Sequence, residues 1–361
     1  MYSRGFLQNM TEIMPADSIA IEFLEVTNNK KSKGKTNMKK ILAIALTLCM
    51  VLSMCAITAS AERAGDVNGD GKFIVGYISK NTTDTFHGPI NTFATATLDK
   101  LVEDGVIDEW TGILDGLTDP GHQCDLADDC IVKGCDAVII LPAEAEGSAP
   151  AVEALTNEGI AVVVVNSKTN NTDDLALTYC GSDDVFAGTL LAQHVVDNCP
   201  DGGKYLHIQG VLGNSAQIQR GEGMHSIMDE LDKFEMVGEL TGNWNSDEAM
   251  KIAEDYLTQY GDELVAIICD NDDMSSGAQG VCNDSGYPGI VCVGVDGNNY
   301  PLSMVKAGTM LATVLQDGVG QIKAGIDAVV ALSKGEAVEK EYSIPFVLVT
   351  SENVDDYYTG E

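Results

Sequence analysis

The chain has 361 residues, of which 45% are apolar, so it can bury a large core and is long enough for two α/β domains. It carries 55 Asp and Glu residues against 21 Lys and Arg, which gives a formal net charge of −34. A charge of this size and sign repels phosphate backbones and anionic lipid headgroups. The composition therefore predicts a folded protein and excludes nucleic acid as a partner.

Residues 38–61 have the three parts of a secretory signal peptide. The segment starts with Met-Lys-Lys, continues as an unbroken apolar run over 41–51, and ends with the small residues Ala59-Ser60-Ala61. The lysines stay in the cytoplasm, the apolar run enters the bilayer, and the small residues fit the protease site. We therefore expect an exported protein, periplasmic or on the cell surface, that begins at Glu62.

Two other interpretations of this segment remain. Its apolar stretch is nearly long enough to be a permanent membrane anchor, and Cys55 is a candidate for lipidation, although the bulky Met54 precedes it. The A-x-A ending favours cleavage over both alternatives. We interpret residues 1–37, which lie upstream of the signal, as a non-native extension, and residues 62–71 as a tether.

From Phe73 onward, short apolar runs alternate with helical patterns, which is typical of parallel sheets covered on both faces. The run Ala-Val-Val-Val-Val at 161–165 has no polar alternation, so it must be buried on both sides. Apolar residues at helical spacing follow at 90–101, and again at 249–256 after Ser246, a predicted N-cap. The predicted strands are 73–78, 112–114, 137–141, 161–165, 205–208, 265–269 and 290–295.

Polar side chains follow several of these strands. Asn166 follows the strand 161–165, Asn271 follows 265–269, and Asp296 follows 290–295. In open parallel sheets ligands bind beyond the carboxyl ends of the strands, and amides and carboxylates suit the hydroxyl groups of a neutral polyol. Each residue alone could be a helix cap, but their recurrence favours a ligand site.

Arg220 and Trp244 are rare residues in unusual positions. Downstream of the signal the chain has only one other arginine, so Arg220, at a predicted helix start, indicates a need for a planar guanidinium; a structural salt bridge is the alternative. Trp244 lies in a polar stretch, where an indole can cover the apolar face of a sugar ring or anchor the loop. Since neither residue is assigned to a core, we expect alanine variants of both to fold.

Motifs for catalysis or metal binding are absent from the sequence. It contains no G-x-S-x-G, H-E-x-x-H, P-loop or dinucleotide fingerprint, and its five histidines show no metal spacing. Asp272 and Asp296 remain as a conceivable glycosidase pair. We expect a protein that is not an enzyme and has no cofactor and no metal site.

Several stretches together resemble the type I periplasmic binding proteins, in the ribose and galactose branch. The most specific runs from Ile208 to Met224, and shorter ones follow at 271–274, 293–297 and 312–316. The resemblance covers residue 72 to about residue 349. It implies an α/β fold of two doubly wound parallel-sheet lobes joined by a three-segment hinge. The N-terminal lobe would comprise 72–182 and 317–344, and the C-terminal lobe 183–316 and 345–361.

The resemblance also implies a site and a function. Phe86 and Trp244 would be stacking rings, and the hydroxyl partners would be Asn166, Arg220, Asn271, Asp296 and Gln316. Such a monomer captures a monosaccharide or related polyol by lobe closure and delivers it to the membrane permease of an ABC importer. The alternative is a sugar or signal receptor for a chemotaxis or sensor-kinase partner. Thr85 and Asn166-Ser167 depart from the ribose pattern, which points to a different sugar.

Overall fold

The structure is a computed structural model that describes residues 63–358 and 360. The predicted signal peptide, the upstream extension and the candidate lipidation site at Cys55 lie outside these residues. The chain from Ala61 onward forms one compact unit. Within 63–358, no helix combines the length and the apolar character that crossing a bilayer requires.

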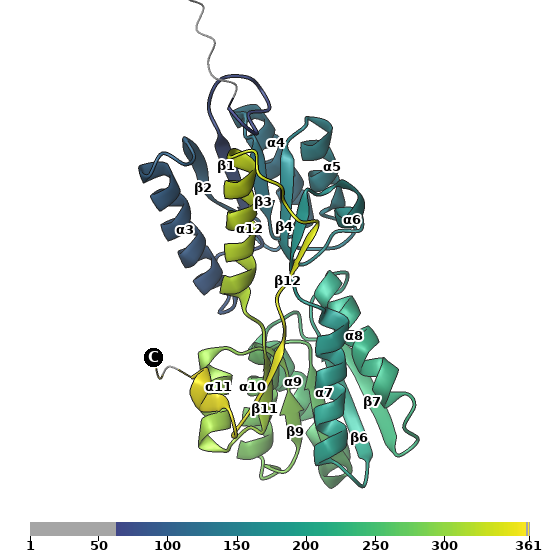
Figure 1. Cartoon of the computed structure of the whole chain (residues 1–361). Helices are drawn as coiled ribbons and strands as arrows, with labels where there is room; N and C mark the ends of the chain where they lie inside the picture. Colours follow the sequence, from purple (N-terminus) through teal and green to yellow (C-terminus); the bar gives the residue numbers. More distant parts are fainter. Residues whose placement is uncertain (1–62, 359, 361) are drawn as a thin grey trace, which may run out of the picture. The chain divides into compact units, whose positions relative to one another are not determined.

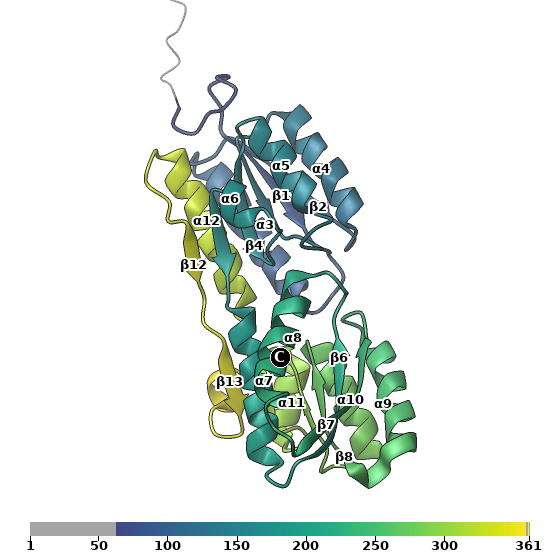
Figure 2. The same cartoon turned by 90° about the vertical axis from the view of Figure 1, so that its right-hand side faces the viewer.

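The first sheet has six parallel strands in the order β12-β5-β4-β3-β1-β2 (Figure 1). The strands are β1 (Ile74–Ser79), β2 (Glu109–Asp115), β3 (Ala137–Ile140), β4 (Ala161–Asn166), β5 (Thr178–Gly181) and β12 (Glu341–Ser343). Helices α3 (His87–Glu103) and α12 (Gly318–Ser333) cover one face, while α4 (Pro120–Lys133) and α5 (Ala149–Asn157) cover the other (Figure 2). The short α6 (Thr172–Leu175) precedes β5. As predicted, β4 is buried almost throughout.

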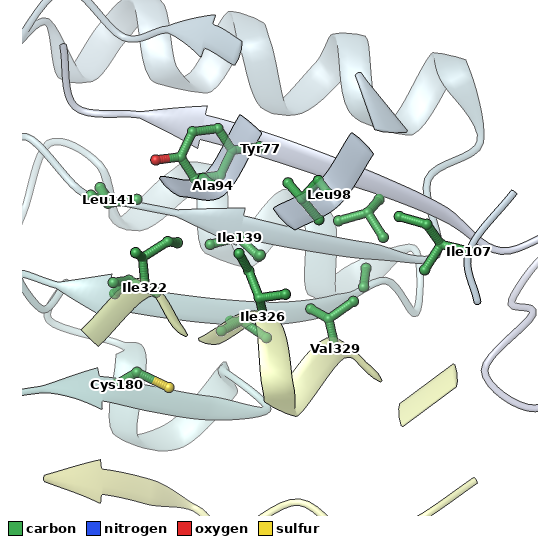
Figure 3. Packing of buried hydrophobic residues seen from close by; sticks show 14 of the residues in the cluster. Tyr77, Ala94, Leu98, Ile107, Ile139, Leu141, Cys180, Ile322, Ile326 and Val329 are labelled. Atoms are coloured by element: carbon green, nitrogen blue, oxygen red, sulfur yellow. The ribbon is translucent and has the colours of Figure 1, made fainter. Parts of the chain in front are cut away.

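The core of this lobe lies between the sheet and the helix pair α3 and α12 (Figure 3). Leu98 on α3 and Ile326 on α12 pack against strand residues such as Tyr77 and Ile139, and all four side chains are almost fully buried. Burial of one such aliphatic side chain contributes about 1.5–3 kcal/mol. The apolar residues at helical spacing in 90–101 lie on the face of α3 that packs against the sheet.

The second lobe contains a parallel sheet of order β7-β6-β8-β9 and a smaller sheet of order β10-β11-β13. The strands are β6 (Gly203–Gln209), β7 (Phe234–Thr241), β8 (Leu264–Cys269), β9 (Val291–Val293), β10 (Val295–Asp296), β11 (Ala312–Leu315) and β13 (Val347–Thr350). Only β13 runs antiparallel to its neighbour among the described strand pairs. The predicted strand 290–295 is divided at Gly294, where a side chain would collide with the carbonyl of Asn271.

Helices α7 (Asp184–Asn198) and α8 (Ser215–Met228) cover one face of the second lobe, and α9 (Ser246–Tyr260) and α10 (Asp272–Asp284) cover the other. Helix α11 (Asn299–Ala307) packs against the C-terminal segment. The N-cap of α9 is Asn245, whose side chain accepts a hydrogen bond from the Glu248 N–H at 3.1 Å, so the prediction of Ser246 as the cap was wrong by one residue.

Close packing of α7 and α8 depends on two glycines. A side chain at Gly188 of α7 would collide with the carbonyl of Arg220, and one at Gly223 of α8 would collide with the carbonyl of Val185. The two helices therefore approach with their backbones nearly in contact. This approach brings Asp184, the first residue of α7, beside Arg220 in the interior of α8.

The chain passes between the sheet of the first lobe and the two sheets of the second lobe three times: between β5 and α7, between β11 and α12, and between β12 and β13. These passages support the division into lobes that we propose, with 72–182 and 317–344 in one lobe and 183–316 and 345–361 in the other.

Candidate functional site

A cavity lies at the carboxyl ends of the strands of both lobes. All seven residues predicted to bind ligand line it: Phe86, Asn166, Arg220, Trp244, Asn271, Asp296 and Gln316. The structure therefore brings together side chains that lie far apart in the sequence, while their role as ligand contacts stays a prediction.

Arg220 is held by the protein on three sides. Its Nε donates to Asp184 Oδ1 at 2.9 Å, Nη1 to the Asp270 carbonyl at 2.6 Å, and Nη2 to Gln316 Oε1 at 3.0 Å. Arg220 lies inside α8 and not at its start, and the ion pair with the buried Asp184 means that the salt-bridge alternative is also realised. A guanidinium has five N–H donors, so two remain for other partners.

Trp244 and Phe86 give the cavity its aromatic surface. The indole lies against the backbone of Gly210, where any side chain would collide with the ring. Phe86 contacts Gly318 at the start of α12 in the same way. Lys80 Nζ lies 5.2 Å from the centre of the Trp244 ring, and the Arg220 guanidinium carbon 5.9 Å from it. Two cations thus lie within cation–π range of one indole.

Backbone strain is concentrated at this cavity. Among the described residues, six other than glycine have positive φ, and three of them are predicted site residues: Asn166 (69°), Trp244 (61°) and Asp296 (148°). Such conformations are costly for residues with a side chain and cluster at functional sites, where the surrounding structure holds them. The strain therefore supports a role for this cavity.

Several residues that line the cavity also have unpaired nitrogen atoms. Within the described part of the chain, four buried side-chain nitrogens have no hydrogen-bond partner, and three of these belong to cavity residues: His87 Nε2, Trp244 Nε1 and Gln316 Nε2. An unpaired buried donor costs about 1–3 kcal/mol. Trp244 Nε1 and Gln316 Nε2 can only donate, so these two nitrogens call for an acceptor such as a hydroxyl oxygen.

Lys80 is a buried cation that follows β1 and lines the cavity, with 6% of its surface exposed. Burial lowers its pKa from 10.5 to about 8, although the carboxylates of Asp84, Asp296 and Asp184 oppose that effect. No carboxylate among the described residues lies within ion-pair distance of its ammonium. The amine is therefore available to a ligand.

Asp296 and Asp272 have different environments. Burial raises the pKa of Asp296 well above its usual range, with a further contribution from Asp272, and its carboxylate faces the cavity. Asp272 does not line the cavity: its oxygens accept the Thr313 hydroxyl at 2.6 Å and the N–H groups of Gly297 and Asn298 at 2.8 and 3.0 Å. These bonds fix the loop that carries Asp296. A glycosidase pair of Asp272 and Asp296 would therefore have only one member in the cavity.

The two lobes are hydrogen-bonded to each other at the rim of the cavity. Thr85 Oγ1 donates to the Asp273 carboxylate at 2.9 Å, Asn214 Nδ2 to the Ala143 carbonyl at 2.8 Å, and the Lys168 N–H to Ser215 Oγ at 2.8 Å. Exchangeable polar contacts of this kind suit a surface that opens and closes.

The predicted site omitted several polar residues of the cavity, among them Lys80, Asp84, Thr85, Asn214 and Asp273. Asp84 binds His87 through the backbone N–H at 2.6 Å and the ring Nδ1 at 2.8 Å. Burial alone would raise the pKa of Asp84, but these bonds hold it well below its usual range. The signal that could have identified Lys80 and Asp84 was their position directly after the first strand.

Two α/β lobes with a polar cavity at the ends of their strands define a solute-binding protein fold. The chain belongs to the family described as periplasmic binding protein domain, whose sequence model matches residues 75–337.

Individual relatives agree with this. The chain is 32% identical to the xylitol-binding protein of Mycolicibacterium smegmatis over 66% of this chain and 67% of that one. It is 33% identical to a putative rhizopine-binding protein of Rhizobium meliloti, over 68% of this chain and 81% of that protein. Among solved structures, the chain is similar to a solute-binding protein of an ABC transporter from Bacillus halodurans C-125 with bound myo-inositol. The two superimpose with a TM-score of 0.73 and are 27% identical, over 79% of this chain and 97% of that chain.

Proposed function

We propose that this protein is an extracytoplasmic solute-binding protein. It closes its two lobes around a monosaccharide or related polyol and delivers it to the permease of an ABC importer. The observation that carries the proposal is the cavity: both lobes contribute to it, its lining combines two aromatic rings with unpaired donors, and it holds three strained residues.

The chemistry of the lining favours a ligand with many hydroxyl groups. Lys80, Trp244 and Gln316 offer donors, and the Asp296 and Asp273 carboxyls offer acceptors. A hydroxyl group donates and accepts at once, so it can satisfy both kinds of partner. One relative is a xylitol-binding protein and one related structure contains bound myo-inositol; both compounds are polyols, which supports this class.

Binding of a polyol is expected to change the emission of Trp244 and to compact the protein. The other tryptophan, Trp110 on β2, donates to Asp99 and does not line the cavity, so a Trp110→Phe variant isolates the Trp244 signal. We expect saturable quenching by at least one of xylitol, myo-inositol, ribose and galactose, and a smaller radius of gyration by X-ray scattering with that ligand. The matched control is Trp244→Phe, which should lose the signal.

Two outcomes would contradict this proposal. If no member of a broad panel of sugars and polyols changes emission or melting temperature, the ligand class is wrong. If a ligand binds without compaction, the lobes do not close around it.

Export is the second part of the proposal. We expect secretion with removal of residues up to Ala61, because Ala59-Ser60-Ala61 fits the protease site. N-terminal sequencing of the secreted protein should then begin at Glu62. A diacylglyceryl-modified Cys55 in the intact mass would instead show a lipid anchor.

A further inference from the structure

A second cluster of polar side chains lies in the lobe that contains Arg220 and consists of His207, His225 and Glu239. His207 lies on β6, Glu239 on the adjacent β7 and His225 on α8. His207 Nδ1 and His225 Nε2 each lie 2.9 Å from the same oxygen, Glu239 Oε1, and the three atoms all lie within 4.8 Å of one another. We propose that these side chains bind a divalent transition-metal ion, with Zn²⁺ as the best match to two imidazoles and one carboxylate.

The geometry is close to that of a zinc site. Zinc binds imidazole nitrogen at about 2.0–2.1 Å and carboxylate oxygen at about 2.0–2.2 Å, so tetrahedral ligands lie about 3.3 Å apart. The two N···O distances of 2.9 Å would widen by a few tenths of an ångström, and the two nitrogens lie within 4.8 Å of each other. The His207 side chain is 1% exposed, whereas His225 and Glu239 are 31% and 32% exposed. An ion can therefore enter from solvent and keep a water as its fourth ligand.

In both histidines, the ring nitrogen that does not face Glu239 lies beside the carboxylate of another residue. His207 Nε2 lies 3.0 Å from Asp270 Oδ1, and His225 Nδ1 lies 3.2 Å from Asp229 Oδ1. Metal-bound histidines nearly always donate their second N–H to such a partner, which orients the ring and leaves the other nitrogen free to bind the metal. Asp270 is itself fixed, because its second oxygen accepts the Gly210 N–H at 2.8 Å.

The charge of the cluster also suits a cation. The carboxylates of Glu239, Asp270 and Asp229 each lie within hydrogen-bond distance of one or both imidazole rings. No Lys or Arg side chain within the described ranges forms an ion pair with any of the three carboxylates. These carboxylates would attract a divalent ion.

The test is metal binding by the tag-free, chelator-treated full chain. We expect one Zn²⁺ to bind per chain in a calorimetric titration that contains excess Mg²⁺, which occupies the acidic surface. Substitution of Co²⁺ should give the intense visible absorption of a tetrahedral site. His225→Gln and Glu239→Gln should each weaken Zn²⁺ binding by about 100-fold or more, since even loss of a supporting partner costs 10–100-fold.

His122→Gln is the matched control, because this histidine lies on α4 in the other lobe and should leave Zn²⁺ affinity unchanged. Melting curves of the metal-free variants check that each one folds. The proposal is overturned if Zn²⁺ does not saturate a single site, or if both cluster variants bind Zn²⁺ like the parent. Since the probe is the metal alone, this result is independent of whether the cavity binds a sugar.

Discussion

Arg220→Ala is expected to lower the free energy of unfolding by about 3–5 kcal/mol, because it leaves the buried carboxylate of Asp184 without its partner. Asp184 is 1% exposed, and Arg220 Nε lies 2.9 Å from it. The sequence predicted that this variant would fold, since Arg220 had no assigned place in a core. The close packing of α7 against α8 instead buries Arg220, which argues against that expectation. Urea unfolding of the ligand-free variant measures the effect.

The companion variant Arg220→Lys separates stability from recognition. Lysine keeps a positive charge beside Asp184 but cannot also reach the Asp270 carbonyl and Gln316 with a planar fork. We expect it to recover most of the stability while ligand affinity, measured by calorimetry, stays about 10- to 150-fold below the parent, the loss typical of one or more charged hydrogen bonds.

The double variant Asp184→Asn/Arg220→Gln provides the control, because a neutral amide pair leaves no unpaired charge in the interior. It should unfold at nearly the parental urea concentration and still bind poorly. Parental affinity in either Arg220→Lys or the double variant would remove Arg220 from the ligand site. Parental stability of Arg220→Ala would show that the ion pair contributes little.

Lys80→Met is expected to have opposite effects on stability and on binding. The folded protein holds the pKa of Lys80 at about 8, below its ordinary value of 10.5. Below pH 8 the charged amine therefore costs about 3 kcal/mol, at 1.36 kcal/mol for each unit of lowered pKa. Methionine has a similar length and no charge, so this variant should be more stable than the parent at pH 7 and bind ligand about 10- to 150-fold more weakly through loss of a charged donor.

The pH dependence has a defined sign. Between pH 8 and 10.5 the unfolded chain binds more protons at Lys80 than the folded chain does, so the parent gains stability as the pH rises through this window. The stability difference between Lys80→Met and the parent should therefore shrink toward pH 10. Melting curves at pH 7 and pH 10 measure it.

The control for this experiment is Lys323→Met. Lys323 is an exposed lysine on α12 that pairs with Asp327, so its replacement should change neither the stability nor the ligand affinity. A destabilised Lys80→Met variant at pH 7 would mean that the surrounding carboxylates outweigh burial. Unchanged ligand affinity would show that the amine does not contact the ligand.

The sequence predicted most strands of the two larger sheets, most clearly where burial on both faces leaves an uninterrupted apolar run, as in β4. It did not predict β5, β7, β11, β12 or β13, of which β7, β12 and β13 are edge strands. Glu235 and Glu239 of β7 are exposed, and β12 has only three residues, with Glu341 and Ser343 exposed. Edge strands form hydrogen bonds on one side only and often carry charged residues, so their apolar signal is weak.

Most of the cavity could be predicted because the ends of parallel strands meet at one edge of a sheet. Its remaining residues depend on contacts across the chain. Lys80 is buried only because residues of both lobes surround the cavity, and Arg220 finds Asp184 only because two glycines allow α7 and α8 to touch. Likewise His207, His225 and Glu239 come from three different elements, so no local spacing indicates that they meet.

The unpaired nitrogens of Trp244 and Gln316 have a consequence for an idle transporter. If the lobes close without cargo and without trapped water, both donors lose solvent and gain nothing, at a combined cost of about 2–6 kcal/mol. The closed form without cargo is then at least about 30-fold rarer than it would be with both donors paired. A permease that recognises the closed lobes would seldom dock an empty carrier, so ATP would be hydrolysed mainly when there is cargo to move.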